Sequence, residues 1–463
     1  METFLLLFMY LALMALVVFI PQGLRRFHVP AVVAIMLTGI VIGPHALDLL
    51  GHLAGWMGAG KEAAASLYTV ISALGLLGLV VLMALAGMEV DIRMLAVEKR
   101  PVTFLSILTF AIPALAGYLV YHMFRPDDEV GKWVYASLFA SHSVGIVFPV
   151  IRELGVSRTR FGVAVLGSTV VTDVLSLIML AVAIQYKRLQ VNTTGTTGFS
   201  IFDRLDLSFL GNGFGFVFVL VIVAYMALCI WMIPYFWKKV LKSFSPKDDT
   251  QVTFFLLSVL LVVTLGEFLG VNLIVGAFIA GLAMVRSEGF EDRGWHLHRK
   301  LEGVGFGVMI PFLFLHIGMD SRPDILLESS GNIAIAVMTV IGLVGSKVFS
   351  GWLALRLCGF SHLKGLCAGL MTVPQLSATL AAAAVALELE MLDLNFFNAI
   401  VVLSMVTTIP VPTLVRFLIC RFNIRFDEAN FPLGTEGTFA SAKPVDDSIN
   451  KSSYLQRVIG RKK

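Results

Sequence analysis

Charged residues are scarce in this sequence: Asp, Glu, Lys and Arg make up 14% of its 463 residues, whereas 57% are hydrophobic. A soluble domain averages about 25% charged residues. A water-soluble fold cannot hide so much apolar surface, so the composition predicts a protein whose solvent is the lipid bilayer. This excludes a soluble enzyme. The net charge of +4 is too small to indicate a polyanion, which excludes a nucleic-acid partner.

Cysteine is scarce as well, and nucleotide-binding motifs are missing. The four cysteines lie far apart in apolar stretches without a C-x-x-C pair, which excludes a disulfide framework and a cysteine-based metal site. No G-x-G-x-x-G follows a strand, so we expect no nucleotide-binding module. The sequence indicates neither a cofactor nor a resident metal.

Long apolar runs are abundant instead and predict an all-α polytopic membrane protein. We expect about 13 transmembrane helices within a transmembrane domain, residues 1–420, and a polar cytoplasmic tail, residues 421–463. The predicted spans are 3–20, 29–43, 67–88, 101–123, 133–151, 162–185, 213–237, 251–268, 270–285, 304–319, 333–355, 365–387 and 395–419.

Basic residues are distributed unevenly between the loops. The loops after the odd-numbered spans up to the eleventh carry 18 Lys and Arg, and the loops on the other side carry seven. Short cytoplasmic loops are enriched in Lys and Arg. We therefore predict a cell-membrane protein (inner or plasma membrane) with its N-terminus outside and its C-terminus in the cytoplasm.

Two charged residues lie in the middle of spans. Asp173 is eleven residues into the sixth span and Lys347 about fourteen into the eleventh, whereas Glu267 and Asp320 sit near span ends. At 1.5 Å per residue both central residues come out near the membrane midplane. An ionisable residue at that depth is costly and marks a functional site, so we expect Asp173 and Lys347 to pair.

Two spans contain proline and small polar residues at the same depth. The fifth reads A-S-H-S-V-G-I-V-F-P-V (140–150) and the twelfth reads L-M-T-V-P-Q-L-S-A-T-L (370–380). Proline breaks the helix and frees backbone carbonyls. The two spans run in opposite directions, and interrupted helices in corresponding positions of two halves indicate inverted repeats around a transport site. The candidate ligands in the breaks are Ser141, His142, Ser143, Gln375 and Ser377.

Longer stretches carry a family resemblance. Residues 153–180, E-L-G-V-S-R-T-R-F-G-V-A-V-L-G-S-T-V-V-T-D-V-L-S-L-I-M-L, resemble the fifth core helix of sodium(potassium)/proton antiporters, and P-F-L-F-L-H-I-G-M-D (311–320) resembles another family stretch. Order and spacing agree over about residues 1–420 with the second cation:proton antiporter superfamily, which includes the sodium/proton exchangers. The resemblance implies a homodimer in which a core domain with two crossed broken helices moves against a rigid interface domain.

The resemblance also implies roles for three residues. Asp173 binds a monovalent cation or H⁺ in competition, and Lys347 is its charge partner. Thr172 stands where electrogenic members have a second Asp, others an Asn and the potassium-efflux branch a Gln. A single carboxylate favours electroneutral exchange of one H⁺ per cation by alternating access, with Na⁺, K⁺ and Li⁺ all open as substrates.

The sequence also has to be compared with what other functions require. A gated potassium-efflux protein of the same fold would be expected to bring a cytoplasmic regulatory domain or a Gln-Asp dipeptide, and the sequence has neither. An intramembrane aspartyl protease needs two mid-span acids, and a serine hydrolase needs G-x-S-x-G, so we predict that the protein is not an enzyme. A sensor of the same fold that transports nothing is a further alternative. Two roles are open for His142: a pH-responsive residue or a hydrogen-bonded core residue.

Overall fold

The fold was analysed in a computed structural model. It describes residues 2–24, 31–56, 60–88, 98–143, 147, 150–151, 154, 156, 159–192, 214–244, 248–285, 300–322, 324, 329–408, 410–422 and 424–426. Every element in these ranges is a helix, as the composition predicts. Most of the predicted tail lies outside the described residues, and so do Gly145 and Pro149 of the fifth span.

The helices follow one another along the chain with short connections. The first seven are α1 (Glu2–Leu24), α2 (Ala31–Ile42), α3 (Leu49–Trp56), α4 (Gly60–Met88), α6 (Lys99–Phe124), α7 (Glu129–Ala140) and α9 (Arg160–Asn192). The next are α10 (Phe214–Phe244), α11 (Asp248–Phe268), α12 (Leu273–Val285), the π-helical segment η4 (Gly305–Met309) and α14 (Ile310–Asp320). The last are α16 (Ser330–Leu357), α17 (His362–Met371), α18 (Ser377–Glu388), α19 (Leu394–Thr408) and α20 (Pro410–Arg421).

Twelve of the predicted spans coincide with one of these helices or with two consecutive ones, and α7 covers the first part of the fifth span, 133–151. Seven helical segments in the described part of the chain are long and apolar enough to cross a membrane, and five shorter apolar helices accompany them. The polytopic fold is therefore confirmed, while the count of about 13 crossings stays a prediction.

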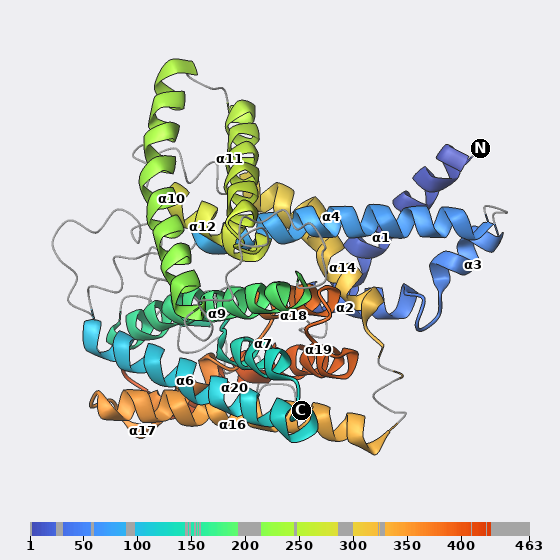
Figure 1. The fold of residues 1–463 in the computed structure, drawn as a ribbon. Coiled ribbons are helices and arrows are strands. Elements are labelled where there is room, and N and C mark those ends of the chain that lie inside the picture. The colour runs from blue at the N-terminus through green and yellow to red at the C-terminus, as the bar shows by residue number, and fades with distance from the viewer. Residues whose placement is uncertain are drawn as a thin grey trace, which may run out of the picture.

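The helices pack in two groups. In one group α4 lies against α12 and α14, and α14 lies against α2; in the other, α6 lies against α7 and α16, and α16 against α17. Figure 1 shows α4, α11 and α12 in the upper part of the molecule and α6, α7, α16 and α17 in the lower part. We call these the upper group and the lower group, and α9, α18 and α19 belong to the lower group, on the side that faces the upper one.

Glycine allows the helices of the upper group to approach closely. A Cβ atom at Gly281 of α12 would collide with the carbonyl of Ala84 in α4, and one at Gly87 would collide with the carbonyl of Phe278. Small residues at such contacts are typical of membrane helix packing, where dispersion contacts replace the hydrophobic effect. The backbones of α4 and α12 therefore pack in direct contact.

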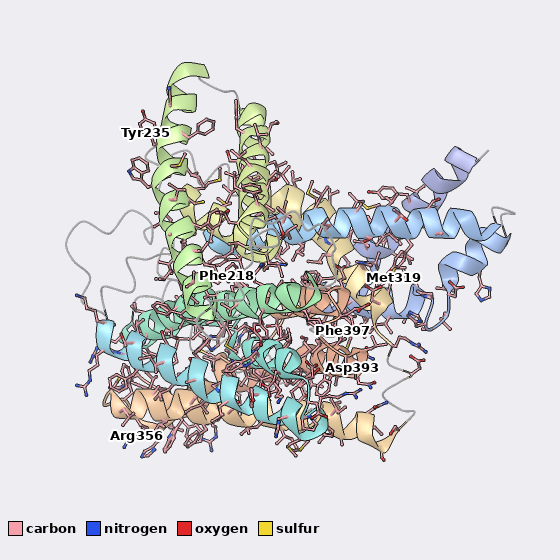
Figure 2. All side chains as sticks on the ribbon, in the orientation of Figure 1. Phe218, Tyr235, Met319, Arg356, Asp393 and Phe397 are labelled. Atoms are coloured by element: carbon pink, nitrogen blue, oxygen red, sulfur yellow. The ribbon has the colours of Figure 1, made fainter. Side chains whose placement is uncertain are left out.

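The outer surface of α10 is apolar. Tyr235 is 72% exposed and Trp231 is 74% exposed, and Figure 2 shows Tyr235 pointing away from the other helices. Phe218 near the start of the same helix is fully buried. An isolated helix face of this kind would be unfavourable in water but suits lipid.

Two helices are interrupted, as the sequence predicts. α7 ends at Ala140, Ser141 takes an extended conformation (φ −60°, ψ 159°), and residues 141–143 are not helical. α17 ends at Met371, and five residues that include Pro374 separate it from α18. The second break therefore falls at its proline, and the first includes residues 141–143, while Pro149 lies outside the described residues.

Candidate functional site

The two breaks are joined by side-chain hydrogen bonds. Gln375 Nε2 donates to the Ser141 carbonyl at 2.8 Å, and Ser141 Oγ donates to Gln375 Oε1 at 3.0 Å. Thr379, in the first turn of α18, also donates its hydroxyl proton to Gln375 Oε1. Ser141 is 6% exposed and Gln375 is fully buried. These reciprocal bonds fix the crossing point of the two interrupted helices.

Lys347 lies at the same crossing. Its side chain, on α16, is fully buried, and Nζ donates to the carbonyls of Ala140, at 3.2 Å, and Ser141. These two carbonyls lie at the C-terminal end of α7, where the helix stops and its partial negative charge is concentrated. The ammonium therefore compensates the half-helix end, and Asp173 is close enough for the two side-chain charges to interact.

Asp173 projects from the middle of α9 toward the first break. It is 7% exposed, and the backbone N–H of His142 donates to Asp173 Oδ1 at 2.9 Å. A hydrogen bond to an ionised carboxylate stabilises the charged form. In an intact helix the N–H of His142 would donate to a backbone carbonyl. In the break it donates to the carboxylate of Asp173 instead.

Thr172 and His142 make a second contact between α9 and the break. Thr172 Oγ1 donates to the backbone carbonyl of Ser168 at 2.9 Å and also contacts His142 Nδ1. Since the hydroxyl proton serves the carbonyl, we assign the proton of the second bond to Nδ1, which leaves Nε2 with a lone pair. His142 Nε2 is buried and has no hydrogen-bond partner, and neither has Ser143 Oγ.

The structure therefore brings most of the predicted site residues together. Asp173, Thr172 and Lys347 meet Ser141, His142 and Gln375 at one point, with Ser143 adjacent. The side chain of Ser377, the first residue of α18, lies outside the described residues. Gln375 and Ser141 use their polar atoms to bind each other, whereas the predicted role of these side chains was to bind a cation.

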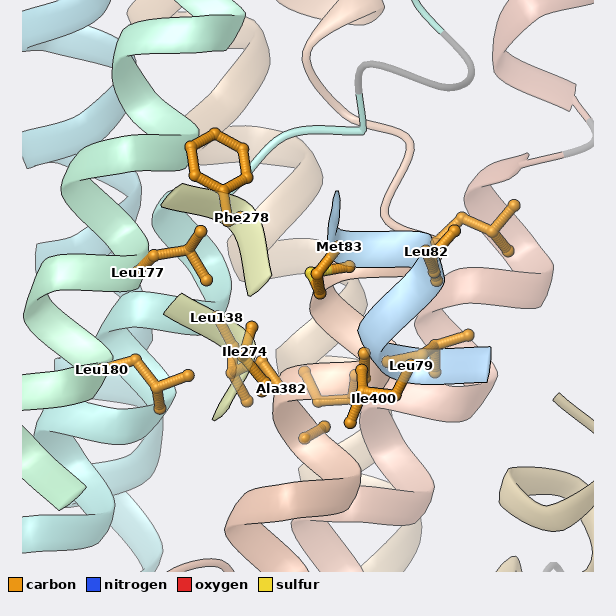
Figure 3. Packing of buried hydrophobic residues seen from close by; sticks show 14 of the residues in the cluster. Leu79, Leu82, Met83, Leu138, Leu177, Leu180, Ile274, Phe278, Ala382 and Ile400 are labelled. Carbon is orange, nitrogen blue, oxygen red and sulfur yellow. The ribbon is translucent and has the colours of Figure 1, made fainter. Parts of the chain in front are cut away.

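A cavity opens on one side of Asp173. It is small, about 20 Å³, which is room for about one water molecule, and it lies between the upper group and the lower group. Asp173, Ser137, Ser141 and Ser176 supply its polar lining, and apolar side chains of α4, α7, α9, α12 and α18 form the rest. Figure 3 shows Met83 of α4 and Phe278 of α12 among the buried side chains of this boundary.

The apolar wall opposite Asp173 was not identified from the sequence. Met83, Ala86 and Phe278 line the cavity from the upper group. They lie in continuous apolar runs, where no pattern separates a residue that faces a cavity from one that faces lipid. Ser137 and Ser176 carry the only weak signal, because each is a polar residue within a helical turn or two of a predicted site residue.

The site suits a cation bound by oxygen atoms. In the part of the chain that the structure describes, no three His, Cys, Asp or Glu side chains gather into a metal-binding cluster. A single carboxylate, hydroxyl groups and unwound backbone carbonyls are the ligands that discontinuous membrane helices offer to monovalent cations.

The chain is similar in sequence to known proteins. The sequence profile of "Sodium/hydrogen exchanger, transmembrane" matches residues 11–420. A protein named "Probable Na(+)/H(+) antiporter 3" from Methanocaldococcus jannaschii is 30% identical over 411 residues, which cover 89% of this chain and 96% of that protein. "Na(+)/H(+)-K(+) antiporter GerN" from Bacillus cereus is 26% identical over 403 residues, which cover 85% and 90% of the two chains.

The fold also matches a solved structure. The sodium proton antiporter MjNhaP1 from Methanocaldococcus jannaschii, at pH 8, superimposes with a TM-score of 0.62 at 14% sequence identity. The match covers 91% of this chain and 98% of that chain. At this identity the likeness concerns the fold alone.

Proposed function

Because the chain belongs to the sodium/hydrogen exchanger family, we propose that it exchanges a monovalent cation for H⁺ across a membrane by secondary antiport. The observation that carries the proposal is the position of Asp173. It is a nearly buried carboxylate at the crossing of two interrupted helices, and it lines a cavity between two groups of helices. Midplane carboxylates at such crossings are typical of transport sites.

Competition at Asp173 provides the coupling. When Asp173 is ionised, movement of the lower group would bring the charged carboxylate against the apolar side chains of Met83 and Phe278. Removing the charge from its polar surroundings in this way costs several kcal/mol. Binding of either H⁺ or a cation neutralises the carboxylate and removes this cost. The lower group then moves past the upper group and exposes the site to the other side, so that neither ion crosses without exchange.

Lys347 and Thr172 set the charge balance of each step. Lys347 remains bonded to the carbonyls of Ala140 and Ser141 and acts as the charge partner of Asp173 without carrying a proton itself. Thr172 has an uncharged hydroxyl at the position where a second acidic residue would add another titratable charge to the site. We therefore propose one H⁺ per cation and electroneutral exchange.

The substrate is Na⁺ or K⁺. Relatives are named as Na⁺/H⁺ antiporters, and one is named as a Na⁺/H⁺-K⁺ antiporter. Hydroxyl and carbonyl ligands accept both cations. We also propose that the protein is a homodimer in a cell membrane, with its N-terminus outside and its C-terminus inside. The alternative to antiport is a gated potassium-efflux protein of the same fold.

Proton movement in proteoliposomes tests the proposal. A pH-sensitive dye inside the vesicles reports the response to added Na⁺, K⁺ or Li⁺ for the wild type, for Asp173→Asn and for the matched control Asp127→Asn, an exposed loop acid. We expect a cation-driven pH change in the wild type and the control and none in Asp173→Asn. Cation flux without proton movement would favour the potassium-efflux alternative.

A further inference from the structure

Two serine hydroxyls line the cavity beside Asp173 without taking part in the crossing of the interrupted helices. Ser176 follows Asp173 by three residues on α9, and side chains at this spacing lie on one face of a helix. Ser137 lies on α7, which packs against α9. Both serines are buried, with 2% of Ser137 and 4% of Ser176 exposed. The two helices therefore present a carboxylate and two hydroxyls to the same small space.

The proton of each hydroxyl is engaged within its own helix. Ser137 Oγ donates to the backbone carbonyl of Val134 at 2.6 Å, and Ser176 Oγ donates to that of Asp173 at 2.9 Å. A carbonyl oxygen can only accept, so it takes the single proton that a hydroxyl has. Neither hydroxyl bonds to a second side chain among the described residues. Each serine oxygen therefore has only lone pairs left for a contact inside the cavity.

The other side chains around the cavity add no hydrogen-bond donor. The hydroxyl of Ser141 is engaged with Gln375 and Thr379 at the crossing. Among the described residues that line the cavity, Asp173 is the one charged side chain, and those other than the serines are apolar. When Asp173 is ionised, the polar atoms that face the cavity are therefore all acceptors.

A lining that only accepts favours a cation over a water molecule. The cavity has room for about one water molecule. A buried water makes about three hydrogen bonds, and its own lone pairs would here meet acceptors or apolar groups. A monovalent cation has no lone pairs to satisfy. The apolar wall of Met83 and Phe278 (Figure 3) offers no oxygen, so the oxygens of α7 and α9 have to replace the water that the cation loses.

We propose that Ser137 and Ser176 are ligands of the transported cation and determine which monovalent cation is preferred. Asp173 supplies the negative charge, and the two hydroxyl oxygens replace part of the water shell. The inference rests on the proposed function for the claim that the bound cation is the substrate, but the binding itself does not require transport. H⁺ needs only the carboxylate, so the two serines affect the cation and not the proton with which it competes.

The size of the cavity and the field of its oxygens both bear on the choice of ion. Ion selectivity depends on the space around the ion or on the number and field strength of its oxygen ligands. Loss of one serine hydroxyl enlarges the space and weakens the field. Both effects disfavour small ions more than large ones, so the preference shifts from Li⁺ toward K⁺.

Transport and binding measured on the same variants test the proposal. In proteoliposomes, the response of an interior pH dye gives the KM of Li⁺, Na⁺ and K⁺ at several pH values. In detergent, the rise of the melting temperature with cation concentration gives a Kd without transport, and the melting temperature without cation reports folding. Ser137→Ala and Ser176→Ala each remove one hydroxyl, whereas Ser176→Cys fills the space but replaces oxygen by sulfur, a weak acceptor.

Ser106→Ala is the matched control. Ser106 is as buried as Ser137, and its hydroxyl also donates to a carbonyl of its own helix, that of Val102 at 2.7 Å. It lies on α6 and does not line the cavity. The control therefore removes the same kind of helix bond without removing an oxygen from the site.

Each alanine variant should raise both KM and Kd about three- to tenfold, because one neutral ligand of a charged ion is lost and water replaces it only in part. The rise should be larger for Li⁺ than for K⁺. Ser176→Cys should raise both constants as well. The maximal rate and the pH at which H⁺ begins to compete should stay unchanged, and Ser106→Ala should match the wild type.

Wild-type values of KM and Kd in both alanine variants would overturn the inference. A lower maximal rate with unchanged KM, or a wild-type Kd in Ser176→Cys, would also overturn it, because the serines would then serve packing alone. Absence of exchange in every protein, with a Kd that the alanine variants still raise, would refute the proposed function and leave the two cation ligands standing.

Discussion

Replacement of Lys347 by methionine tests whether the lysine compensates the end of α7. Methionine retains the bulk of the side chain but removes the charge and the bonds to the carbonyls of Ala140 and Ser141. Removing one partner of a buried charge pair costs about 3–5 kcal/mol. Asp173 can take up a proton once its partner is gone, which limits the loss, so we expect about 3 kcal/mol of destabilisation.

The matched comparison is Gln375→Leu at the same crossing. There the Ser141 carbonyl keeps its bond from Lys347, and the Ser141 hydroxyl can still donate to the carbonyl of Leu138 at 3.0 Å. The variant loses the bonds between Gln375 and Ser141 and the bond from Thr379 to Gln375, and in membranes a hydrogen bond between helices contributes on average about 0.6 kcal/mol. We therefore expect about 1 kcal/mol for this variant.

Unfolding of the solubilised protein by titration with a denaturing detergent measures both free energies. Lys99→Met is the control, because Lys99 is exposed at the start of α6 and its replacement should change stability by less than about 0.5 kcal/mol. A Lys347→Met variant that is as stable as Gln375→Leu would refute the reasoning, since charge compensation would then contribute no more than a neutral amide.

Three further expectations follow from the same geometry. Thr172→Asp places a second carboxylate beside Asp173 and should make exchange respond to membrane potential, measured with and without valinomycin in a K⁺ gradient. Phe278→Asn adds a polar group to the apolar wall of the cavity and should allow proton leak without added cation, measured by dye quenching in the absence of Na⁺ and K⁺. Arg125→Gln removes an ion pair with Asp393 whose side chains are 55% and 29% exposed, and it should lower the free energy of unfolding by less than about 1 kcal/mol.

Hydropathy and proline predicted most of the fold. Apolar runs located the helices because each helix in lipid must satisfy its own backbone, which leaves few alternatives to a continuous span. Pro374 predicted the second break correctly because proline removes a helical hydrogen bond at its own position. The first break includes residues 141–143 of the predicted stretch, where Ser141 and His142 bond to residues far away in the sequence, and no local pattern records such contacts.

The candidate site was predictable in part. Asp173 and Lys347 stood out because ionisable residues are so rare in the spans. The bonds of Lys347 to backbone carbonyls, and the mutual bonding of Ser141 and Gln375, depend on how two half-helices cross and could not be read from the sequence. The sequence placed Asp320 only near a span end, yet it accepts a hydrogen bond from Tyr68, 252 residues away.

Proton release on cation binding tests the central claim most directly. The solubilised protein is kept in weak buffer at a pH at which Asp173 is protonated, and Na⁺ or K⁺ is added while the pH is recorded. Mutual exclusion at Asp173 predicts about one H⁺ released per cation bound by the wild type, and none by Asp173→Asn. Cation binding by the wild type without proton release, or equal release from the variant, would contradict the account.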